Sequence, residues 1–365
     1  MKKPLWALIF ALEILIGAAG ESLAGTPLKI GIVNTSGVDD GSFTQDCYRG
    51  ILEFVNANPG STVTSVKEPD LDKILQAVAD VVADYDVLVL PGFQFSAVTS
   101  IAAENPDKIM ILVDAVPVDE EGNTVELPNI YSMVFREEEG GFFAGIAAAL
   151  TSQTGRVAVV NGMAYPSNVN YQYGFMSGVS YANKHLGAGA VCVELPSYAG
   201  VDVAGAGVGG NYIGAWADEA TGKVVGSALI GQGVDVLFVA AGASGNGVFT
   251  AAKEVDGVYL IGCDVDQYDD GVKGGDNIML TSALKVMHAN VIKQLEAVGG
   301  GQFAGKNDIL GVDADSIGYV STPGRHRLSS RTLEALEKAY GLLKSGAIVP
   351  AANFNGHKPD NFPGL

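Results

Sequence analysis

Two patterns of apolar and polar residues alternate along the chain. Short, continuous apolar runs are typical of buried strands, whereas longer segments with apolar residues every three or four positions predict helices. Strands are expected at 28–33, 87–92, 108–114, 155–162, 190–195, 234–242 and 257–264. Helices are expected at 42–58, 71–85, 96–106, 137–152, 170–185, 221–233, 245–255 and 330–346. The chain is therefore expected to consist of repeated strand–helix units.

These units form two successive rounds, which divide near Phe135. Strands that are apolar along their whole length are buried on both faces, as in parallel sheets covered by helices. A chain of 365 residues also exceeds the usual size of one domain. We therefore predict an α/β fold of two lobes. Two further strand-like segments, 277–285 and 316–322, stand where the chain could cross back between the lobes.

The first 24 residues have the pattern of a secretory signal peptide. Lys2 and Lys3 precede the apolar run 4–12, and small residues follow up to Ala24, after which we expect cleavage. Glu13 leaves too short an apolar run for a membrane-spanning anchor. No cysteine lies near the cleavage position, so a lipid anchor of the bacterial lipoprotein type is not indicated. We expect the mature protein to be soluble and exported.

The formal net charge of the chain is -19 at pH 7, and its basic residues form no stripe along the sequence. Binding to nucleic acid requires Lys and Arg side chains that neutralise phosphates. We therefore exclude nucleic acid as a partner. The acidity is interpreted as a solubilising surface.

Signatures of catalysis are scarce in this sequence. The segment 242–246 resembles the nucleophile elbow G-x-S-x-G, but Asn246 replaces the final glycine. The four histidines show no metal-ligand spacing, and no phosphate-binding loop is present. The three cysteines, Cys47, Cys192 and Cys263, are expected to pack in the core rather than form a disulfide. We predict no catalytic residue, no metal and no cofactor, and hence a protein that binds rather than reacts.

Polar and aromatic residues follow the predicted strands in both halves of the chain. In parallel α/β sheets, ligands bind beyond the carboxyl ends of the strands, where helix N-termini and loop amides converge. The candidates at these positions are Asn34, Asp39, Asp40, Phe43, Asp114, Trp216, Gly242, Ser244, Asp264, Asp266 and Gln267. They predict a binding cleft between two lobes, with loops from each.

The first predicted helix carries a start signal of its own. Ser42 and Gln45 match a capping box, in which the serine hydroxyl accepts a hydrogen bond from the backbone amide three residues later. The two aspartates just before them also suit the positive end of a helix. None of this explains Phe43, whose ring either packs between helix and strand or faces the cleft.

Several stretches of the chain resemble the basic membrane protein family of ABC-transporter substrate-binding proteins, whose best-understood members are purine nucleoside receptors. The stretches, which follow the family order, are DDGSFTQDCYRGI, LPGFQFS, NPDKIMILVD, NIYSMVFREEEGGFFAG, NYIGAWAD, GVDVLFVAAGASGNGV, IGCDVDQ and LTSALK. The resemblance implies the type I periplasmic-binding-protein fold, in which two α/β lobes joined by three crossing segments enclose the ligand. It implies an N-terminal lobe of residues 28–134 plus about 284–310, and a C-terminal lobe of residues 135–283 plus about 311–350.

The resemblance also implies roles for single residues. Phe43 and Trp216 match two aromatic positions that sandwich a nucleobase, and such stacking contributes about 1–3 kcal/mol per base. Asp264 matches a carboxylate that accepts hydrogen bonds from ribose hydroxyls, and Lys285 matches a lysine on the sugar side. Gly242 matches a glycine whose backbone lies against the ligand.

Base recognition is where the sequence departs from the family pattern. Asn34 stands where the family commonly has an aspartate, and an asparagine donates as well as accepts hydrogen bonds. Asp114 keeps the other base-side carboxylate, Asp40 is expected near the rim of the pocket, and Thr44 replaces the usual asparagine. We therefore expect the base to be read differently here.

Together these features predict a monomeric periplasmic binding protein of an ABC importer. It would capture a purine nucleoside or a related ligand and deliver it to a permease in the inner membrane. One alternative is another heteroaromatic ligand, such as a free nucleobase or a flavin. Two others are a secreted α/β enzyme acting on a nucleotide or sugar, and a ligand-sensing partner of a membrane receptor. The sequence identifies neither the base nor the permease.

Overall fold

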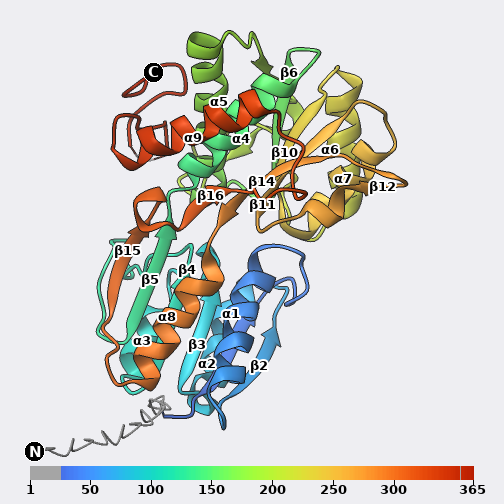
Figure 1. Ribbon diagram of the computed structural model, residues 1–365. Coiled ribbons are helices and arrows are strands. Elements are labelled where there is room, and N and C mark those ends of the chain that lie inside the picture. The colour runs from blue at the N-terminus through green and yellow to red at the C-terminus, as the bar shows by residue number, and fades with distance from the viewer. Residues whose placement is uncertain (1–25, 354) are drawn as a thin grey trace, which may run out of the picture.

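The computed structural model describes residues 26–353 and 355–365, which form two lobes, each built on one six-stranded sheet (Figure 1). Two short antiparallel hairpins accompany these sheets: β8 (Gly200–Val201) with β9 (Gly207–Gly209), and β12 (Val272–Lys273) with β13 (Asp276–Asn277). The predicted signal peptide, residues 1–24, lies outside the described residues. Within the described part of the chain, no helix has the length and apolar character needed to cross a membrane.

The sheet of the first lobe has the strand order β2-β1-β3-β4-β5-β15, and all its neighbouring strands are parallel. Its strands are β1 (Lys29–Asn34), β2 (Thr62–Lys67), β3 (Val87–Pro91), β4 (Ile109–Val113), β5 (Ile130–Phe135) and β15 (Lys306–Leu310). Its helices are α1 (Phe43–Ala57), α2 (Ile74–Val81), α3 (Thr99–Glu104) and α8 (Met287–Gly299). Alternate residues of β3 pack into two different core clusters, with Val87 and Val89 on one face and Leu88 and Leu90 on the other. Burial on both faces explains the unbroken apolar runs in the sequence.

The sheet of the second lobe repeats this arrangement in the order β7-β6-β10-β11-β14-β16. Its strands are β6 (Arg156–Asn161), β7 (Val191–Cys192), β10 (Val236–Ala240), β11 (Tyr259–Asp264), β14 (Met279–Lys285) and β16 (Ile317–Tyr319), the last of which is antiparallel to β14. Its helices are α4 (Glu137–Thr151), α5 (Pro166–Leu186), α6 (Glu219–Gly231), α7 (Gly245–Lys253) and α9 (Ser330–Lys344). The predicted α/β architecture is confirmed.

The chain crosses between the lobes three times: from β5 to α4, from β14 to α8 and from β15 to β16. As a result, the late segments α8 and β15 lie in the lower lobe of Figure 1, beside the early strands. Three neighbouring segments of the chain therefore connect the two lobes, and they can act as a hinge.

Helices α4 and α5 of the second lobe cross at backbone contact. A Cβ atom on Gly145 would lie 2.1 Å from the carbonyl oxygen of Phe175, and one on Gly178 would lie 2.2 Å from that of Phe142. Gly141 and Gly174 are equally tight against the opposite helix. Glycines four residues apart on each helix thus form one flat face, and α4 follows directly from the first crossing segment. The close crossing fixes the helix that begins at the hinge.

The predicted capping box at the start of α1 is wrong. Ser42 is the N-cap residue, but its side chain caps no helical amide. Asp40 Oδ1 instead accepts hydrogen bonds from the backbone amides of Ser42 (3.1 Å) and Gln45 (3.0 Å). Asp40 Oδ2 accepts a third from Thr44 (3.0 Å). A carboxylate two residues upstream reaches the same amides and adds a full negative charge at the positive end of the helix.

We predict that Gly178→Ala destabilises the protein by about 1–3 kcal/mol, because the added methyl group forces α4 and α5 apart. Urea denaturation of the ligand-free protein measures this. Gly341→Ala is the matched control: Gly341 is exposed on α9 and has open space around its Cβ position. Helix propensity predicts that this control gains about 0.5–1 kcal/mol. Equal destabilisation of both variants would contradict the close crossing.

We predict that Asp40→Ala costs about 1–2 kcal/mol of stability in the ligand-free protein, since the first turn of α1 loses its cap. The control is Asp39→Ala, which removes the neighbouring, exposed carboxylate and should change stability by less than about 0.5 kcal/mol. Thermal or urea unfolding of both variants tests the assignment. A neutral Asp40→Ala would mean that another group caps the helix.

Candidate ligand-binding site

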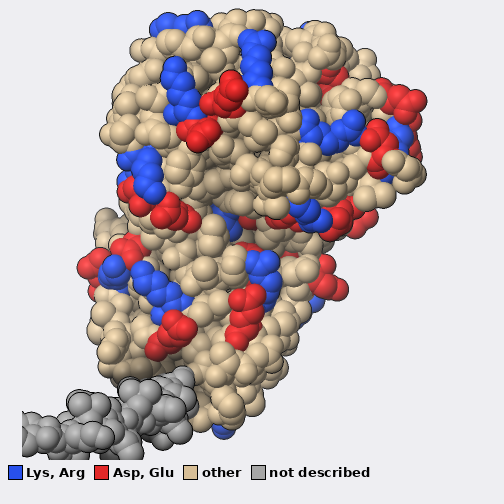
Figure 2. Space-filling model, in the orientation of Figure 1, with Lys and Arg blue, Asp and Glu red and all other residues tan. Residues whose placement is uncertain are grey.

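A pocket of about 660 Å³, its mouth included, lies where the strand ends of both sheets meet. Its lining comes from both lobes and consists of Thr35, Ser36, Asp40, Phe43, Thr44, Pro91, Gly92, Phe93, Gln94, Asp114, Tyr165, Ser167, Asn168, Tyr171, Trp216, Ala240, Gly242, Cys263, Asp264 and Lys285. Figure 2 shows the waist between the lobes, with Lys and Arg interspersed among Asp and Glu on this face. Seven of the predicted positions line this pocket: Asp40, Phe43, Asp114, Trp216, Gly242, Asp264 and Lys285. The other candidates do not: Asn34, Asp39, Ser244, Asp266 and Gln267.

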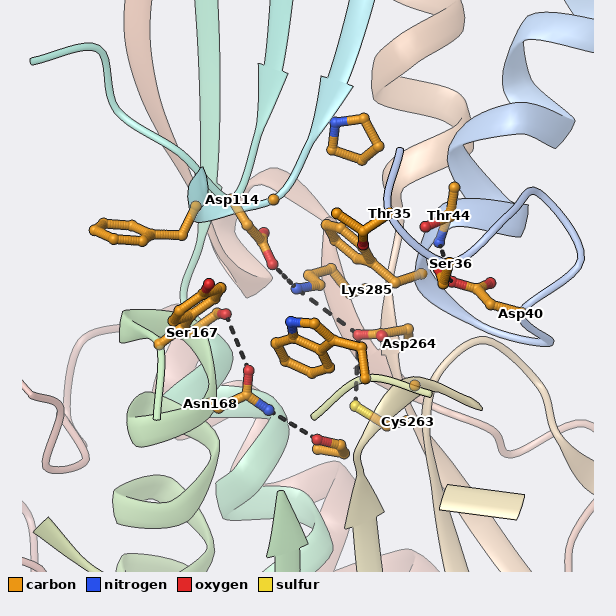
Figure 3. Close-up of a pocket in the computed structure, with 18 of the residues that line it drawn as sticks. Thr35, Ser36, Asp40, Thr44, Asp114, Ser167, Asn168, Cys263, Asp264 and Lys285 are labelled. Carbon is orange, nitrogen blue, oxygen red and sulfur yellow. Dashed lines mark hydrogen bonds and ion pairs between the residues drawn. The ribbon is translucent and has the colours of Figure 1, made fainter. Parts of the chain in front are cut away.

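Lys285 is the charged centre of the pocket wall. Its side chain, only 2% exposed, ends β14 at the second crossing between the lobes. The Lys285 ammonium lies 2.5 Å from Asp114 Oδ2 and 3.7 Å from Asp264 Oδ1. In Figure 3 these two carboxylates approach it from opposite sides. Each lobe thus supplies one counter-charge to the same lysine.

Glu137, the first residue of α4, provides a third carboxylate, with Oε1 3.4 Å from the Lys285 ammonium. Burial alone would lower the pKa of Lys285, but the carboxylates of Asp114, Asp264 and Glu137 outweigh it and hold the pKa well above its usual value. The lysine is therefore charged throughout the physiological range.

Asp114 and Asp264 occupy equivalent places in the two lobes. Asp114 directly follows β4 and Asp264 ends β11, and these strands take the same position in their sheets. Both residues have a left-handed backbone conformation, with φ of 59° and 69°. Aspartate tolerates this conformation better than most residues do. The left-handed turn at each strand end aims the carboxylate at Lys285 and into the pocket.

The carboxylates differ in how fully they are hydrogen-bonded. Asp264 Oδ1 accepts from the Tyr171 hydroxyl (3.0 Å), and its Oδ2 accepts from the Ser42 hydroxyl of the other lobe (3.0 Å). Asp114 Oδ1 is buried and has no hydrogen-bond partner among the described residues. A buried acceptor without a donor costs free energy, so Asp114 offers an open site to a ligand donor.

Aromatic rings from both lobes line the pocket. The Phe43 ring lies 4.9 Å from the Lys285 ammonium, which is also within 5.5 Å of the rings of Phe135 and Tyr171. Cation–π attraction therefore adds to the ion pairs in holding the lysine. Phe43 faces the cleft, which answers the question that its sequence position raised.

A second set of aromatic rings makes contact across the cleft. Phe93 of the first lobe lies 5.3 Å from Tyr165 of the second, ring centre to ring centre, and Tyr165 lies 5.8 Å from Trp216. The indole is partly exposed and lines the pocket rather than the core. Gly162 makes room for it, since a Cβ there would lie 2.4 Å from the indole.

Gly242 lines the pocket beside Trp216, as predicted, and its backbone conformation gives a reason of its own for a glycine. A Cβ at this position would make ordinary contacts, 3.4 Å from the Trp216 carbonyl oxygen and 3.6 Å from its ring. The backbone of Gly242 is left-handed, with φ of 53°, and most side chains disfavour that conformation. The glycine is therefore needed for the turn after β10 rather than for space alone.

Asn34 does not line the pocket, so the structure gives no support to its predicted contact with the base. The side chain is buried, and its amide donates to Ser65 Oγ (3.0 Å) and the Val66 carbonyl (3.4 Å). Its Oδ1 accepts from the Gly37 amide (2.7 Å). Asn34 therefore ties the loop after β1 to β2, and an asparagine suits this place because it both donates and accepts.

Asp40 lines the pocket, but both of its oxygens accept backbone amides of α1, as described above. Its contribution to the pocket is therefore structural first. Ser244, the residue at the centre of the elbow-like segment, is fully buried. Its hydroxyl donates to the Ala215 carbonyl (2.9 Å) and accepts from the Asp218 amide (2.7 Å). Ser244 holds the loop that carries Trp216 and does not face the pocket.

The sequence pattern did not identify Phe93, Tyr165, Tyr171 and Glu137. Phe93 and Tyr165 follow β3 and β6, so the strand-end rule that found the other candidates could have found them. Tyr171 and Glu137 carry no such signal: one is inside a helix, and the other belongs to an acidic first turn that is normally solvated. Only the packing of α4 and α5 brings these two side chains to Lys285.

The three cysteines are free, as predicted. Burial raises the pKa of the Cys192 thiol to about 12 and that of Cys47 and Cys263 well above the usual value. Because the thiolate is the reactive form, none of these thiols is activated for chemistry.

Comparison with known proteins agrees with the resemblance seen in the sequence. The family model described as "ABC transporter substrate-binding protein PnrA-like" matches residues 28–189 and 204–341. The CD4+ T-cell-stimulating antigen of Listeria monocytogenes is 29% identical, over 87% of this chain and 90% of its own length. Basic membrane protein A of Borreliella burgdorferi is 26% identical over 88% of each chain. The ABC transporter nucleoside-binding protein BmpA of Lactococcus lactis is 28% identical over 81% of this chain and 83% of its own.

Solved structures agree with the fold. An ABC transporter solute-binding protein from Aeropyrum pernix superimposes with a TM-score of 0.74 at 21% identity, covering 90% of this chain and 95% of that chain. One from Conexibacter woesei gives a TM-score of 0.62 at 18% identity, covering 87% and 97%. At such identities the likeness confirms the type I periplasmic-binding-protein fold. With the family match over most of its length, the chain belongs to the PnrA-like ABC transporter substrate-binding proteins.

Proposed function

We propose that the protein captures a purine nucleoside, or a closely related ligand, between its two lobes in the periplasm and delivers it to an ABC permease. The observation that carries the proposal is the free, buried Oδ1 of Asp114 in a pocket lined by aromatic rings. A purine offers both a flat ring for stacking and N–H donors for a carboxylate. Transport of this kind would need no catalytic group.

Rings from both lobes support a planar ligand. Phe43 and Trp216 line the pocket from opposite lobes. A base between two rings gains about 1–3 kcal/mol for each stacking contact. Because the rings belong to different lobes, stacking on both favours closure of the hinge.

Asp264 and Lys285 support a ribose on the ligand. An ionised carboxylate has about four lone-pair sites, and two protein hydroxyls occupy only part of the capacity of Asp264. Vicinal ribose hydroxyls could therefore donate to it as well. Charge-assisted hydrogen bonds of this kind contribute about 1.5–3 kcal/mol each.

The BmpA relative from Lactococcus lactis is named a nucleoside-binding protein, which favours the same ligand class here. The base itself is left open, because the residue expected to read it, Asn34, is buried within the first lobe. The loop that Asn34 holds presents Thr35 and Ser36 to the pocket instead. Their hydroxyls can donate or accept, so they suit more than one purine.

Native mass spectrometry of the exported protein, purified without refolding, tests the proposal most directly. We expect a retained molecule with the mass of a nucleoside. Calorimetry of the emptied protein with nucleosides, nucleobases and flavins then identifies the class. Absence of binding heat and of a thermal shift with all three classes would refute a heteroaromatic ligand.

Asp264→Ala separates a nucleoside from a free base or a flavin ring system. We predict a loss of affinity of about tenfold or more for a ribosylated ligand, equivalent to about 1.4 kcal/mol, and almost none for a free nucleobase. Calorimetric titration of the variant with both ligands measures the difference. Asp269→Ala is the control, because this exposed carboxylate of the same loop lies outside the pocket lining. An equal loss for base and nucleoside would place Asp264 away from the sugar.

A further inference from the structure

The cluster around Lys285 contains more negative than positive charge. Asp114, Glu137 and Asp264 surround a single ammonium, and the four side chains are 6%, 2%, 11% and 2% exposed, in the order Asp114, Glu137, Asp264, Lys285. With every carboxyl ionised, the cluster would carry two uncompensated charges away from water. Uncompensated buried charge is unfavourable enough that a group normally takes up a proton instead.

The geometry distinguishes which carboxyl carries the proton. Asp114 forms the short ion pair with Lys285, at 2.5 Å. Asp264 accepts hydrogen bonds from two hydroxyl groups, and its Oδ1 lies 3.4 Å from the Cys263 thiol sulfur. Donors of this kind favour the ionised form of a carboxyl.

Glu137 has the weakest support of the three as a charged group. Its Oε1 is 3.4 Å from the lysine, and its Oε2 accepts a hydrogen bond from the neutral amide of Asn170 at 3.3 Å. Burial raises the pKa of Glu137 to about 8, against the opposing attraction of Lys285. The negative charges of Asp114 and of Glu138 act in the same direction as burial.

The other groups around Glu137 come from several elements. Tyr171 on α5 faces it and has a pKa held well above the usual value by burial and by the charge of Asp264. Cys263 on β11 is likewise protonated. On α4 itself, Glu139 points away and accepts the Val312 amide (2.7 Å). Burial raises the pKa of Asp114 as well, but its 2.5 Å ion pair with Lys285 opposes this shift. Glu137, at 3.4 Å from the ammonium, has the weaker ion pair of the two and is the carboxyl that we assign the proton.

Hydrogen bonds through Asn170 also fix the position of Glu137. Asn170 of α5 donates to it, and the Oδ1 of Asn170 accepts the backbone amide of Asn353, in the segment after α9 (2.9 Å). Glu137 is absent from the pocket lining, so it acts on a ligand only through Lys285. It therefore has the contacts of a positioning residue.

We propose that Glu137 positions Lys285 for ligand capture as a neutral carboxylic acid, and that its ionisation in mildly alkaline solution weakens capture. This inference rests on the proposed nucleoside-binding function of the same pocket. Asp114 belongs to the first lobe, while Asp264 and Tyr171 belong to the second. Closure over a ligand keeps water away from the cluster, so the cost of an added charge is greater in the closed state.

The direction of the pH effect follows from linkage. If the closed, liganded state holds the Glu137 proton more tightly than the open state does, binding takes up a proton and affinity falls as pH rises. The same proton affects folding. Because the unfolded chain releases it at lower pH, the stability that it contributes is full in acid and is lost as pH rises through about 8.

The binding test compares the full-length mature protein and its Glu137→Gln variant, which imitates the protonated acid. Inosine, guanosine and adenosine are titrated calorimetrically at several values between about pH 7 and about pH 9. We expect wild-type affinity to fall by about threefold or more over this range and that of Glu137→Gln to stay level. Glu137→Ala, which removes the acceptor, should lose about tenfold at the lower pH, whereas Glu137→Gln restores most of it.

Glu138→Gln is the matched control, with the same change one residue along the same helical turn. Glu138 makes no ion pair with Lys285, so this variant should still lose affinity as pH rises. The fall should begin at a slightly lower pH than in wild type, because the charge of Glu138 helps to raise the pKa of Glu137. Parallel pH profiles for wild type and Glu137→Gln would overturn the proposal. If Glu138→Gln instead made the affinity independent of pH, the effect would belong to Glu138, and the proposal would be overturned as well.

A second readout separates this inference from the proposed function. Urea denaturation without ligand should show wild type losing stability relative to Glu137→Gln as pH rises from about 5 to about 8. If none of the three nucleosides binds at any pH, the proposed ligand class fails, and this difference still decides the state of Glu137. Identical denaturation profiles in that case would overturn the role of Glu137.

Discussion

The ammonium group of Lys285 lies buried where the two lobes meet, and the rest of the site is arranged around its charge. A buried cation is tolerated only with close counter-charges and hydrogen bonds. Asp114 of the first lobe and Asp264 of the second supply them. Because the counter-charges belong to different lobes, the complete cluster forms only when the lobes are together. The interaction that stabilises the lysine thus also favours the closed cleft.

The two lobes place their aspartates beside Lys285 through the same local backbone structure. Equivalent strands, β4 and β11, end in an aspartate with a left-handed backbone. The turn directs each carboxylate away from its own sheet and toward the other lobe. Direct contacts between the lobes add to this, since the Ser42 hydroxyl reaches Asp264 and Phe93 packs on Tyr165. A ligand between the lobes therefore completes a closure that the protein has largely prepared.

Stiffness near the hinge matters for the same reason. Glu137 begins α4 immediately after the first crossing segment, and the glycine contacts between α4 and α5 leave that helix little freedom. The Lys285 cluster is thus supported by the rigid α4–α5 pair on one side and by contacts between the lobes on the other.

The sequence by itself determined most of the strands and helices and the two-lobe α/β plan, because hydrophobic periodicity is a local property. It did not predict strands β2, β5 and β15 or helix α8. It also placed Phe43, Asp114, Trp216 and Asp264 at a cleft, since parallel strand ends converge by geometry. It could not show that Asp40 rather than Ser42 caps α1, or that Asn34 turns inward, because each depends on which backbone groups lie within reach. Glu137 joins Lys285 only through the packing of α4. Local pattern thus decided where ligand-binding residues gather, and only the tertiary structure decided which of them face the ligand and which hold the others in place.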